Sequence, residues 1–216
     1  MRKRTVQACQ TDFRQPNFYH LLRRFLYDQL HSESEYDDIA PNCLPEFRGK
    51  LSIYPSAVAT FFAPSDICGV GGMSRERIRA VPSWRRGPPR YDCIFVHTDP
   101  SAEGMRGLDV ARVRAFFSFV SRGITYPCAL VHWFSRVGDE ADEDTGMWVV
   151  EPDLDETGSP LAAIIHLDTV LQAAHLMGVC GEAFIPKTIT SANSLDAFYS
   201  FYVNKFIDHH TFEIVF

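Results

Sequence analysis

Two segments near the ends of the chain carry apolar residues at helical spacing. Between Asn17 and His31 such residues recur every three or four positions, which predicts a helix over 17–31; they are Phe18, Leu21, Leu22, Phe25, Leu26 and Leu30. Ser194 is a suitable N-cap for a second helix. Its apolar positions are Leu195, Phe198, Tyr199, Tyr202, Val203 and Phe206. Asp168 predicts the start of a short helix that ends near Met177.

The centre of the chain has the composition of β-strands. Runs of β-branched and aromatic residues predict strands at 51–53, 58–62, 91–96, 147–150, 161–167 and 211–216. The clearest alternation runs from residue 110 to residue 120, where one side of a strand would carry Ala111, Val113, Ala115, Phe117 and Phe119. The other side would carry Arg112, Arg114 and Ser118. The turn at 121–123 leads into a second β-rich run at 124–134, so we expect a β-hairpin.

These elements predict an α+β fold. An antiparallel β-rich centre, either a small barrel or a strongly bent sheet, would lie between an N-terminal and a C-terminal helix. Residues 1–50 would supply the N-terminal helix and an acidic loop, packed on a β-rich main domain at 51–216 that includes the C-terminal helix. The 216 residues suit one domain overall, and a hydrophobic fraction of 46% supplies a core.

Composition limits the cellular compartments in which we expect the protein. The chain has no apolar run of the roughly 18 residues that a membrane helix needs, and residues 1–7 lack the apolar segment of a signal peptide. Six cysteines lie far apart without a C-x-x-C pair, which favours reduced thiols. We therefore expect a nuclear or cytoplasmic protein that is not secreted and has no membrane partner.

Charge is divided unevenly along the chain, although the total is −6. Residues 1–114 carry 17 Lys+Arg and 13 Asp+Glu, whereas residues 115–216 carry 4 and 14. Within 73–91, the candidate nucleic-acid-binding residues are Arg75, Arg77, Arg79, Arg85, Arg86 and Arg90, with Trp84 as a stacking or anchoring side chain. Arginines beside an aromatic ring suit a nucleic-acid backbone. The competing interpretation pairs these arginines internally with the acidic residues of 139–144.

Other motifs carry less chemical information. The glycines of 69–72 fit a flexible turn, since neither a P-loop nor a dinucleotide-binding fingerprint surrounds them. Residue types that bind zinc occur late in the chain, at a spacing that matches no standard zinc module: His166, His175, Cys180, Asp208, His209 and His210. The sequence has no nucleophile elbow and no local Cys/His signature. It therefore predicts no catalytic residue and no cofactor.

Five groups of residues between 80 and 216 are similar to sequence phrases that occur together in one protein family. Residues 84–93 are similar to the phrase F-H-G-x-P-R-Y-D, with Trp84-Arg85-Arg86 in place of its Phe-His pair. The next groups are 111–119 with 126–134, 144–150, and 165–170 with 174–176. Residues 202–212 are similar to Y-L-V-N-D-x-x-D-x-D-M-F, with Lys205 and His209-His210 at acidic positions. In this order the phrases resemble the C-terminal part of Plavaka-type CACTA-like transposases of basidiomycete fungi.

The resemblance implies a domain that follows the catalytic core of such a transposase. The acidic metal-binding triad of that core has no counterpart in this chain. The chain would then be a non-catalytic accessory domain that contacts DNA or another part of the transposition complex. Bromo-adjacent homology domains and SH3-like barrels are its architectural analogies.

Two other functions stay open on the sequence alone. A protein-interaction or chromatin-reading module would use an aromatic pocket made by Tyr126, Trp133 and Trp148, and an acidic loop that attracts a basic segment such as a histone tail. The loop residues are Asp139, Glu140, Asp142, Glu143 and Asp144. A metal-dependent hydrolase would instead use His175, Cys180, Asp208 or His209, with zinc as the metal these residue types favour.

Overall fold

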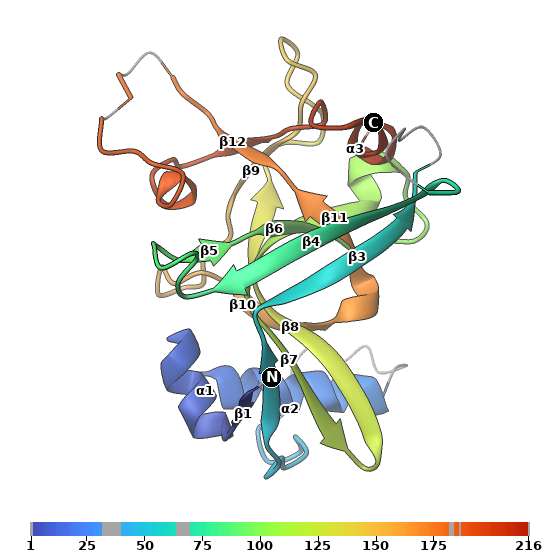
Figure 1. The fold of residues 1–216 in the computed structure, drawn as a ribbon, viewed down its shortest axis with the longest axis vertical. Helices are drawn as coiled ribbons and strands as arrows, with labels where there is room; N and C mark the ends of the chain where they lie inside the picture. The colour runs from blue at the N-terminus through green and yellow to red at the C-terminus, as the bar shows by residue number, and fades with distance from the viewer. Residues whose placement is uncertain (1, 32–39, 64–69, 182–183, 186, 216) are drawn as a thin grey trace.

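The computed structural model describes residues 2–31, 40–63, 70–181, 184–185 and 187–215. These residues contain the helices α1 (Val6–Phe13), α2 (Phe18–Leu30) and α3 (His209–Val215), and the 3-10 turns η1 (Gly104–Gly107), η2 (Leu167–Thr169) and η3 (Ser194–Asp196). The strands are β1 (Arg2–Arg4), β2 (Leu51–Tyr54), β3 (Ser56–Phe62), β4 (Met73–Val81), β5 (Arg90–Tyr91), β6 (Cys93–His97), β7 (Leu108–Ser121), β8 (Ile124–Arg136), β9 (Val149–Pro152), β10 (Ala162–His166), β11 (Val170–Ala174), β12 (Leu176–Gly178) and β13 (Phe201–Val203). An antiparallel β-rich centre with helices at both ends confirms the predicted α+β fold (Figure 1).

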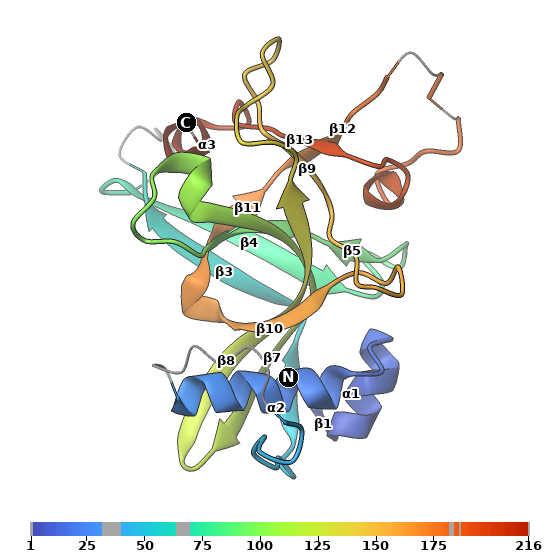
Figure 2. The same cartoon turned by 180° about the vertical axis from the view of Figure 1, so that it is seen from behind.

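The predicted β-hairpin is present as β7 and β8, and it organises the larger sheet. Pairing continues from Val110 opposite Phe134 to Ser121 opposite Ile124. Each long strand changes its outer neighbour along its length: β7 pairs with β6 and then with β2, while β8 pairs with β10 and β9. The sheet therefore bends strongly (Figure 2), and across the described strands it does not close into a barrel. Of the two predicted forms, the bent sheet is the correct one.

A β-bulge in β7 corrects the predicted alternation of side chains. The two neighbours of Arg114 pair with consecutive residues of β8, so Arg114 is an extra residue in its strand. Because side chains alternate with a period of two, one extra residue moves all later side chains to the opposite face. The five apolar residues expected on one side are therefore divided between two buried clusters, with Ala111 and Val113 in one and Ala115, Phe117 and Phe119 in the other.

The N-terminal helices cover the second of these clusters. The helix predicted at 17–31 is present as α2, and Phe18 meets Phe117 edge to face with ring centroids 5.5 Å apart. Helix α1 is an addition to the prediction, and the Thr5 hydroxyl caps it by accepting a hydrogen bond from the Ala8 N–H at 3.3 Å. Both helices lie in the lower part of Figure 1. None of the described helices has the length and apolar character needed to span a membrane.

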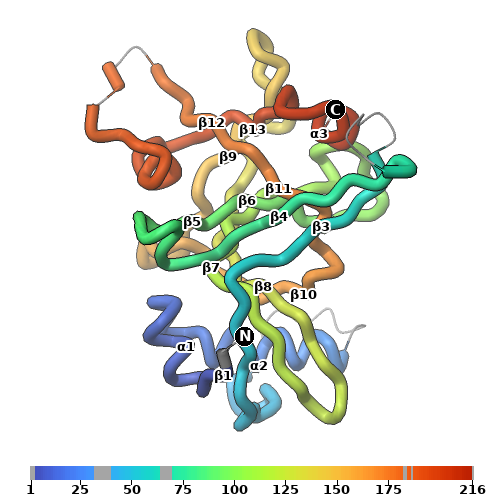
Figure 3. The backbone as a smooth tube through the Cα atoms, viewed as in Figure 1, coloured from blue at the N-terminus to red at the C-terminus, as the bar shows by residue number. Residues whose placement is uncertain are grey.

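Strands β3, β4 and β5 form a separate antiparallel sheet that crosses the larger one (Figure 3). Its inner face places Ile78 and Ala80 in a buried cluster with Ile94 and Val113. The turn between β3 and β4 contains Gly71 and Gly72 at φ of 62° and 77°, the left-handed region that glycine adopts readily. The expected glycine turn is thus present, while Gly69 lies outside the described residues.

The C-terminal part of the chain departs from the prediction. The helix expected from Ser194 to Phe206 is replaced by η3 and β13, and the helix expected at 168–177 is replaced by η2, β11 and β12. Strand β12 pairs with β13 and β11 with β6, so backbone pairing outweighs the helical spacing of these short segments. Of the strand expected at 211–216, residues 211–215 are instead part of α3, where the Asp208 carboxylate accepts a hydrogen bond from the Thr211 N–H at 2.7 Å; Phe216 lies outside the described residues.

Insertion of one alanine between Ala115 and Phe116 should unfold the protein, because the shift by one residue would turn Phe117 and Phe119 away from the N-terminal helices. Loss of one buried phenylalanine side chain costs about 3–5 kcal/mol, so misplacing two approaches the whole stability of a domain. We expect circular dichroism to show no cooperative urea transition. Deletion of Arg114 removes only the extra residue, so Val113 and Ala115 can still pair with Val131 and Leu130 and the transition should persist. A cooperative transition in the insertion variant would contradict this dependence on side-chain alternation.

Candidate functional site

The outer face of β4 carries a row of arginines. Arg75, Arg77 and Arg79 alternate along the strand with residues that point toward the core, and Arg75 and Arg77 are exposed. The residues opposite them on β3 carry no charge: Thr60, Val58 and Ser56. Glu76, the one acidic residue of segment 73–91, faces inward and accepts a hydrogen bond from the Ala173 N–H at 2.9 Å. The outer face therefore keeps its positive charge.

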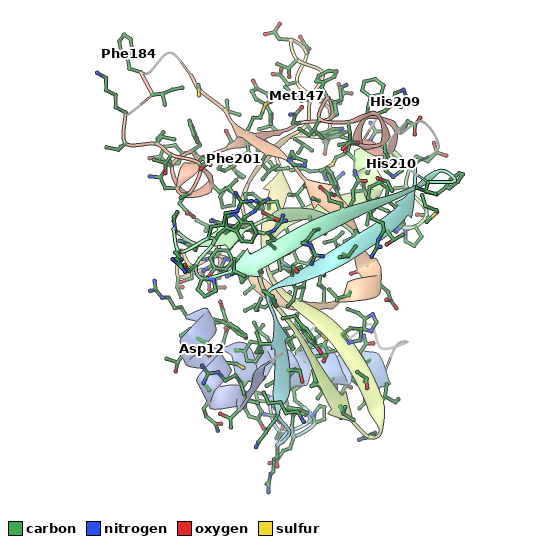
Figure 4. All side chains as sticks on the ribbon, viewed as in Figure 1. Asp12, Met147, Phe184, Phe201, His209 and His210 are labelled. Carbon is green, nitrogen blue, oxygen red and sulfur yellow. The ribbon has the colours of Figure 1, made fainter. Side chains whose placement is uncertain are left out.

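Trp84 gathers three guanidinium groups at the end of this row, that of Arg79 from the row itself and two from the segment that follows β4. The carbon at the centre of each guanidinium lies 4.7 Å from the ring centroid for Arg79, 5.4 Å for Arg85 and 5.6 Å for Arg90. The turn that carries Trp84 is closed by hydrogen bonds from the Trp84 N–H to the Pro88 carbonyl and from the Gly87 N–H to the Trp84 carbonyl. In Figure 4, side-chain nitrogen atoms gather at this end of β4 and β5. Trp84 is thus a platform that positions cations rather than a free stacking surface.

Few acidic groups compensate this surface. Asp92 forms an ion pair with Arg90 at 2.7 Å and accepts a hydrogen bond from the Arg79 N–H at 2.8 Å. Arg77 donates to the Ser56 hydroxyl at 3.0 Å. Within the described part of the chain, no ion pair joins these arginines to the acidic residues of 139–144. The internal pairing considered from the sequence is therefore not how this surface is arranged. The outer row and the Trp84 group, together with the exposed Arg86 of the same turn, are called the arginine surface below; its residues are Arg75, Arg77, Arg79, Trp84, Arg85, Arg86 and Arg90.

The three aromatic residues proposed to form one pocket do not come together. Tyr126 belongs to the cluster under the N-terminal helices, Trp148 to the cluster near α3, and Trp133 to the cluster between the two sheets. Tyr126 and Trp148 are buried, and Trp133 is half-buried. A cage made by all three rings is therefore not formed.

Trp133 instead lines an open cavity of about 750 Å3. Four aspartates and two arginines surround it: Asp99, Asp109, Asp139, Asp153, Arg106 and Arg136. The carboxylates of Asp109 and Asp153 make no ion pair or hydrogen bond to any described residue. Of the acidic loop, Asp139 lines this cavity, Glu140, Glu143 and Asp144 are exposed, and hydrogen bonds from Thr145 lower the pKa of Asp142. Sequence reasoning missed Asp99, Asp109 and Asp153, which come from separate segments and share no motif.

The metal-ligand candidates are distributed over separate interactions. His175 lies 3.7 Å from Glu76, His209 lies 3.2 Å from Glu213, and Asp208 caps α3. His210 stacks on Phe61 with centroids 4.8 Å apart, His166 lies beside Asp168, and the Cys180 thiol faces the Gly178 carbonyl; Figure 4 labels His209 and His210. Among the described residues, no three His, Cys, Asp or Glu side chains are grouped as metal ligands would be.

The described cysteines are free thiols, and the three buried ones lack the features of a nucleophile. Burial raises the pKa of Cys9 to about 11 and that of Cys93 to about 12. Burial also raises the pKa of Cys128. A reactive cysteine needs the opposite shift, toward the thiolate.

The Glu76–His175 pair should make stability depend on pH. The Glu76 carboxylate raises the pKa of His175 above its ordinary value of 6.5, against the effect of burial. Burial acts to raise the pKa of Glu76, but the interactions with His175 and the Ala173 N–H lower it below its ordinary value of 4.5. The stabilisation is therefore fully present between these two ordinary values. It is lost as pH rises through the pKa of folded His175 and as pH falls through that of folded Glu76.

His175→Gln should therefore reduce stability at about pH 5.5 and have a smaller effect at about pH 8.5. The pair is partly exposed, so we expect a difference of at most about 1 kcal/mol between the two pH values. Urea unfolding at both values measures it. Glu76→Gln retains an acceptor for the Ala173 N–H and should remove the same pH dependence. Equal losses at both pH values in His175→Gln would show that the charge of His175 makes no contribution.

Comparison of the whole chain with protein-family models, with curated proteins and with solved structures found no match in any of the three. The case for a function therefore depends on the geometry and charge of the arginine surface and of the cavity at Trp133.

Proposed function

We propose that this chain is a non-catalytic accessory domain that binds nucleic acid through the arginine surface. The observation that carries the proposal is the convergence of Arg79, Arg85 and Arg90 on one tryptophan ring, beside the exposed row of Arg75 and Arg77. The positive charges of these guanidinium groups repel one another, and among the described residues Asp92 forms an ion pair with Arg90 alone, so further anions beside them would be favourable. A phosphate backbone supplies anions at regular spacing along an extended path.

The geometry favours contact with phosphates over contact with bases. Three guanidinium groups already surround the Trp84 ring, so an unpaired base would have to displace them in order to stack. Arginine side chains on a strand and a turn can instead follow a duplex backbone and donate paired hydrogen bonds to its phosphates. Binding would be salt-dependent and largely independent of sequence.

The resemblance of residues 80–216 to CACTA-like transposases suggests which nucleic acid is bound. In this proposal the chain is part of, or derived from, a fungal transposon-encoded transposase. It contacts transposon DNA in the nucleus, beside a catalytic core formed by other residues. The arginine surface supports the DNA contact, and other transposase domains are the expected protein partners.

Replacing Arg85 and Arg86 by asparagine should weaken DNA binding. Both residues have positive φ, 51° and 65°, a region that asparagine adopts readily, so the turn should persist. Loss of two phosphate contacts should lower the slope of log K against log salt concentration by about 2 for duplex DNA. Fluorescence anisotropy with labelled duplex and single-stranded DNA across a salt series measures both the affinity and the slope.

Arg122 provides a matched control for this experiment. It is an exposed arginine with φ of 50°, in the β7–β8 turn at the bottom of Figure 1, away from β5, which lies at mid-height on the left. Arg122→Asn removes one charge from a residue of positive φ, as the single variant Arg86→Asn does, and should leave the salt slope unchanged. An equal loss of affinity in Arg122→Asn and Arg86→Asn would mean that net charge alone governs binding. Such a result would remove the arginine surface as a site.

We propose recognition of a basic peptide as a second candidate function. The cavity beside Trp133 combines an aromatic ring with two half-buried carboxylates, Asp109 and Asp153, that no described residue neutralises. An arginine or lysine side chain of a partner, such as a chromatin protein, would gain both charge pairing and contact with the ring. This candidate retains the acidic and aromatic elements expected from the sequence, but with Trp133 as the one aromatic residue of the site.

Asp109→Asn together with Asp153→Asn should weaken binding of an arginine- and lysine-rich peptide by roughly tenfold, about 1.4 kcal/mol. Isothermal titration calorimetry at low salt measures this affinity. The control is Glu156→Gln, which removes an exposed carboxylate from the turn that follows β9. If the control weakens binding as strongly as the cavity variant, then the peptide is held by general electrostatic attraction and the cavity is not its site.

A further inference from the structure

One face of the β7–β8 hairpin contains a polar gap between two hydrophobic clusters. Val110 and Phe134 lie in the cluster near α3, while Ala115 and Leu130 lie in the cluster under the N-terminal helices. Between these two pairs of residues, the same face of the hairpin carries Arg112 opposite His132, followed by the bulged Arg114. A continuous apolar face would have joined the two clusters. The polar residues at this level therefore need a separate explanation.

Arg114 is held in this gap by the bulge and by an aromatic ring. The centre of its guanidinium lies 4.2 Å from the Tyr91 ring centroid, and that of Arg112 lies 5.9 Å from it. The Nε atoms of Arg112 and Arg114 are both buried and have no hydrogen-bond partner among the described residues. Bulges often aim a side chain toward a binding site. Two buried donors without acceptors are costly unless a ligand supplies the acceptors.

The positive charge of the gap is only partly compensated by the described residues. Arg112 forms an ion pair with Asp196 at 2.5 Å, but the Asp196 side chain is 62% exposed and that of Arg112 only 12%. Arg114 makes no ion pair with any residue that the structure describes. Burial lowers the pKa of Arg114 most strongly, and the charges of Arg112 and Arg14 also lower it, whereas Tyr91 and Asp196 act to raise it. A half-buried cation beside two others requires an anion for stability.

His132 contributes no further positive charge to the gap. Burial lowers its pKa to about 4, and the neighbouring Arg114 and Arg112 add to this effect. The neutral ring lies 3.4 Å from the Gln15 side-chain oxygen. At neutral pH the group formed by Arg14, Arg112, Arg114 and Asp196 therefore has a formal charge of +2. This charge matches a phosphate monoester or inorganic phosphate near its dianionic form.

We propose that Arg112 and Arg114 form a binding site for a single phosphoryl group. Arginine donors in a planar fork suit the tetrahedral oxygens of phosphate, and the bulge would supply one fork next to the other. The site is separate from the arginine surface. Tyr91 faces inward beside Ala80, whereas Arg90, the preceding residue, faces outward beside Val81. The inference therefore does not depend on the proposed function.

The phosphoryl group could be that of free phosphate or that of a phosphorylated nucleic-acid end, and the experiment distinguishes the two. The first arm compares thermal unfolding of the whole chain in potassium phosphate and in potassium chloride at equal ionic strength. We expect phosphate to raise Tm by about 2–4 °C at saturating concentration. Arg114→Gln should abolish this rise, and the Arg85→Asn/Arg86→Asn variant should retain it.

The second arm compares a 5′-phosphorylated oligonucleotide with the same oligonucleotide lacking that phosphate. Tighter binding of the phosphorylated form, lost in Arg114→Gln, would assign the phosphoryl group to a nucleic-acid end. Equal binding of the two forms, together with the Tm rise in phosphate, would assign it to free phosphate. If the Arg85→Asn/Arg86→Asn variant loses DNA binding but keeps the Tm rise in phosphate, the arginine surface binds DNA and the phosphoryl site is independent of it.

A variant that fails to fold does not prevent the test. Arg114→Lys keeps the charge but loses the fork, so it should fold and bind phosphate roughly tenfold more weakly. Circular dichroism verifies the fold of each variant. The proposal is overturned if the wild-type chain shows no phosphate-specific rise over chloride. It is also overturned if folded Arg114→Gln and Arg114→Lys retain the full rise.

Discussion

Backbone hydrogen bonds between β7 and β8 hold together every other part of the structure. The two strands are the longest in the described chain, and each pairs with different neighbours along its length. One face of the hairpin supports the N-terminal helices and the region near α3, and the other supports the β3–β4–β5 sheet. The bulge at Arg114 decides which residues face which cluster. A single extra residue thus distributes the apolar side chains of β7 over two cores.

The same hairpin separates the charged groups of the molecule. Arginines of β4, the following turn and β5 lie on the outer face of the small sheet, where Trp84 positions three of them. Carboxylates of Asp109 and Asp153 lie at the cavity beside Trp133, on the larger sheet. Since these groups form no ion pairs with one another among the described residues, each surface is available to a partner of opposite charge. A net charge of −6 therefore hides two surfaces of different sign.

The candidate sites differ in how far the sequence could predict them. The arginine surface comes from one continuous segment, so its composition was visible before the fold was known. The cavity at Trp133 combines residues near positions 99, 109, 139 and 153, which no local motif connects. The three aromatic residues Tyr126, Trp133 and Trp148 share composition but not position, because neighbouring strands turn them toward three different clusters. Side chains from separate segments meet only where strand pairing brings them together.

The sequence by itself determined the elements whose patterns are long and regular. Helix α2, the β7–β8 hairpin and the β-rich centre follow from periodicity, since burial of one face imposes that periodicity on the residues. Tertiary structure decided the short elements: residues 201–203 and 170–178 became strands because partner strands supplied their hydrogen bonds, despite helical spacing. Tertiary structure also determined the position of the bulge, because a single unpaired residue does not change the composition of the strand. The positions of Arg112, Arg114 and Tyr91 relative to one another depend on that bulge, and so does the site we infer there.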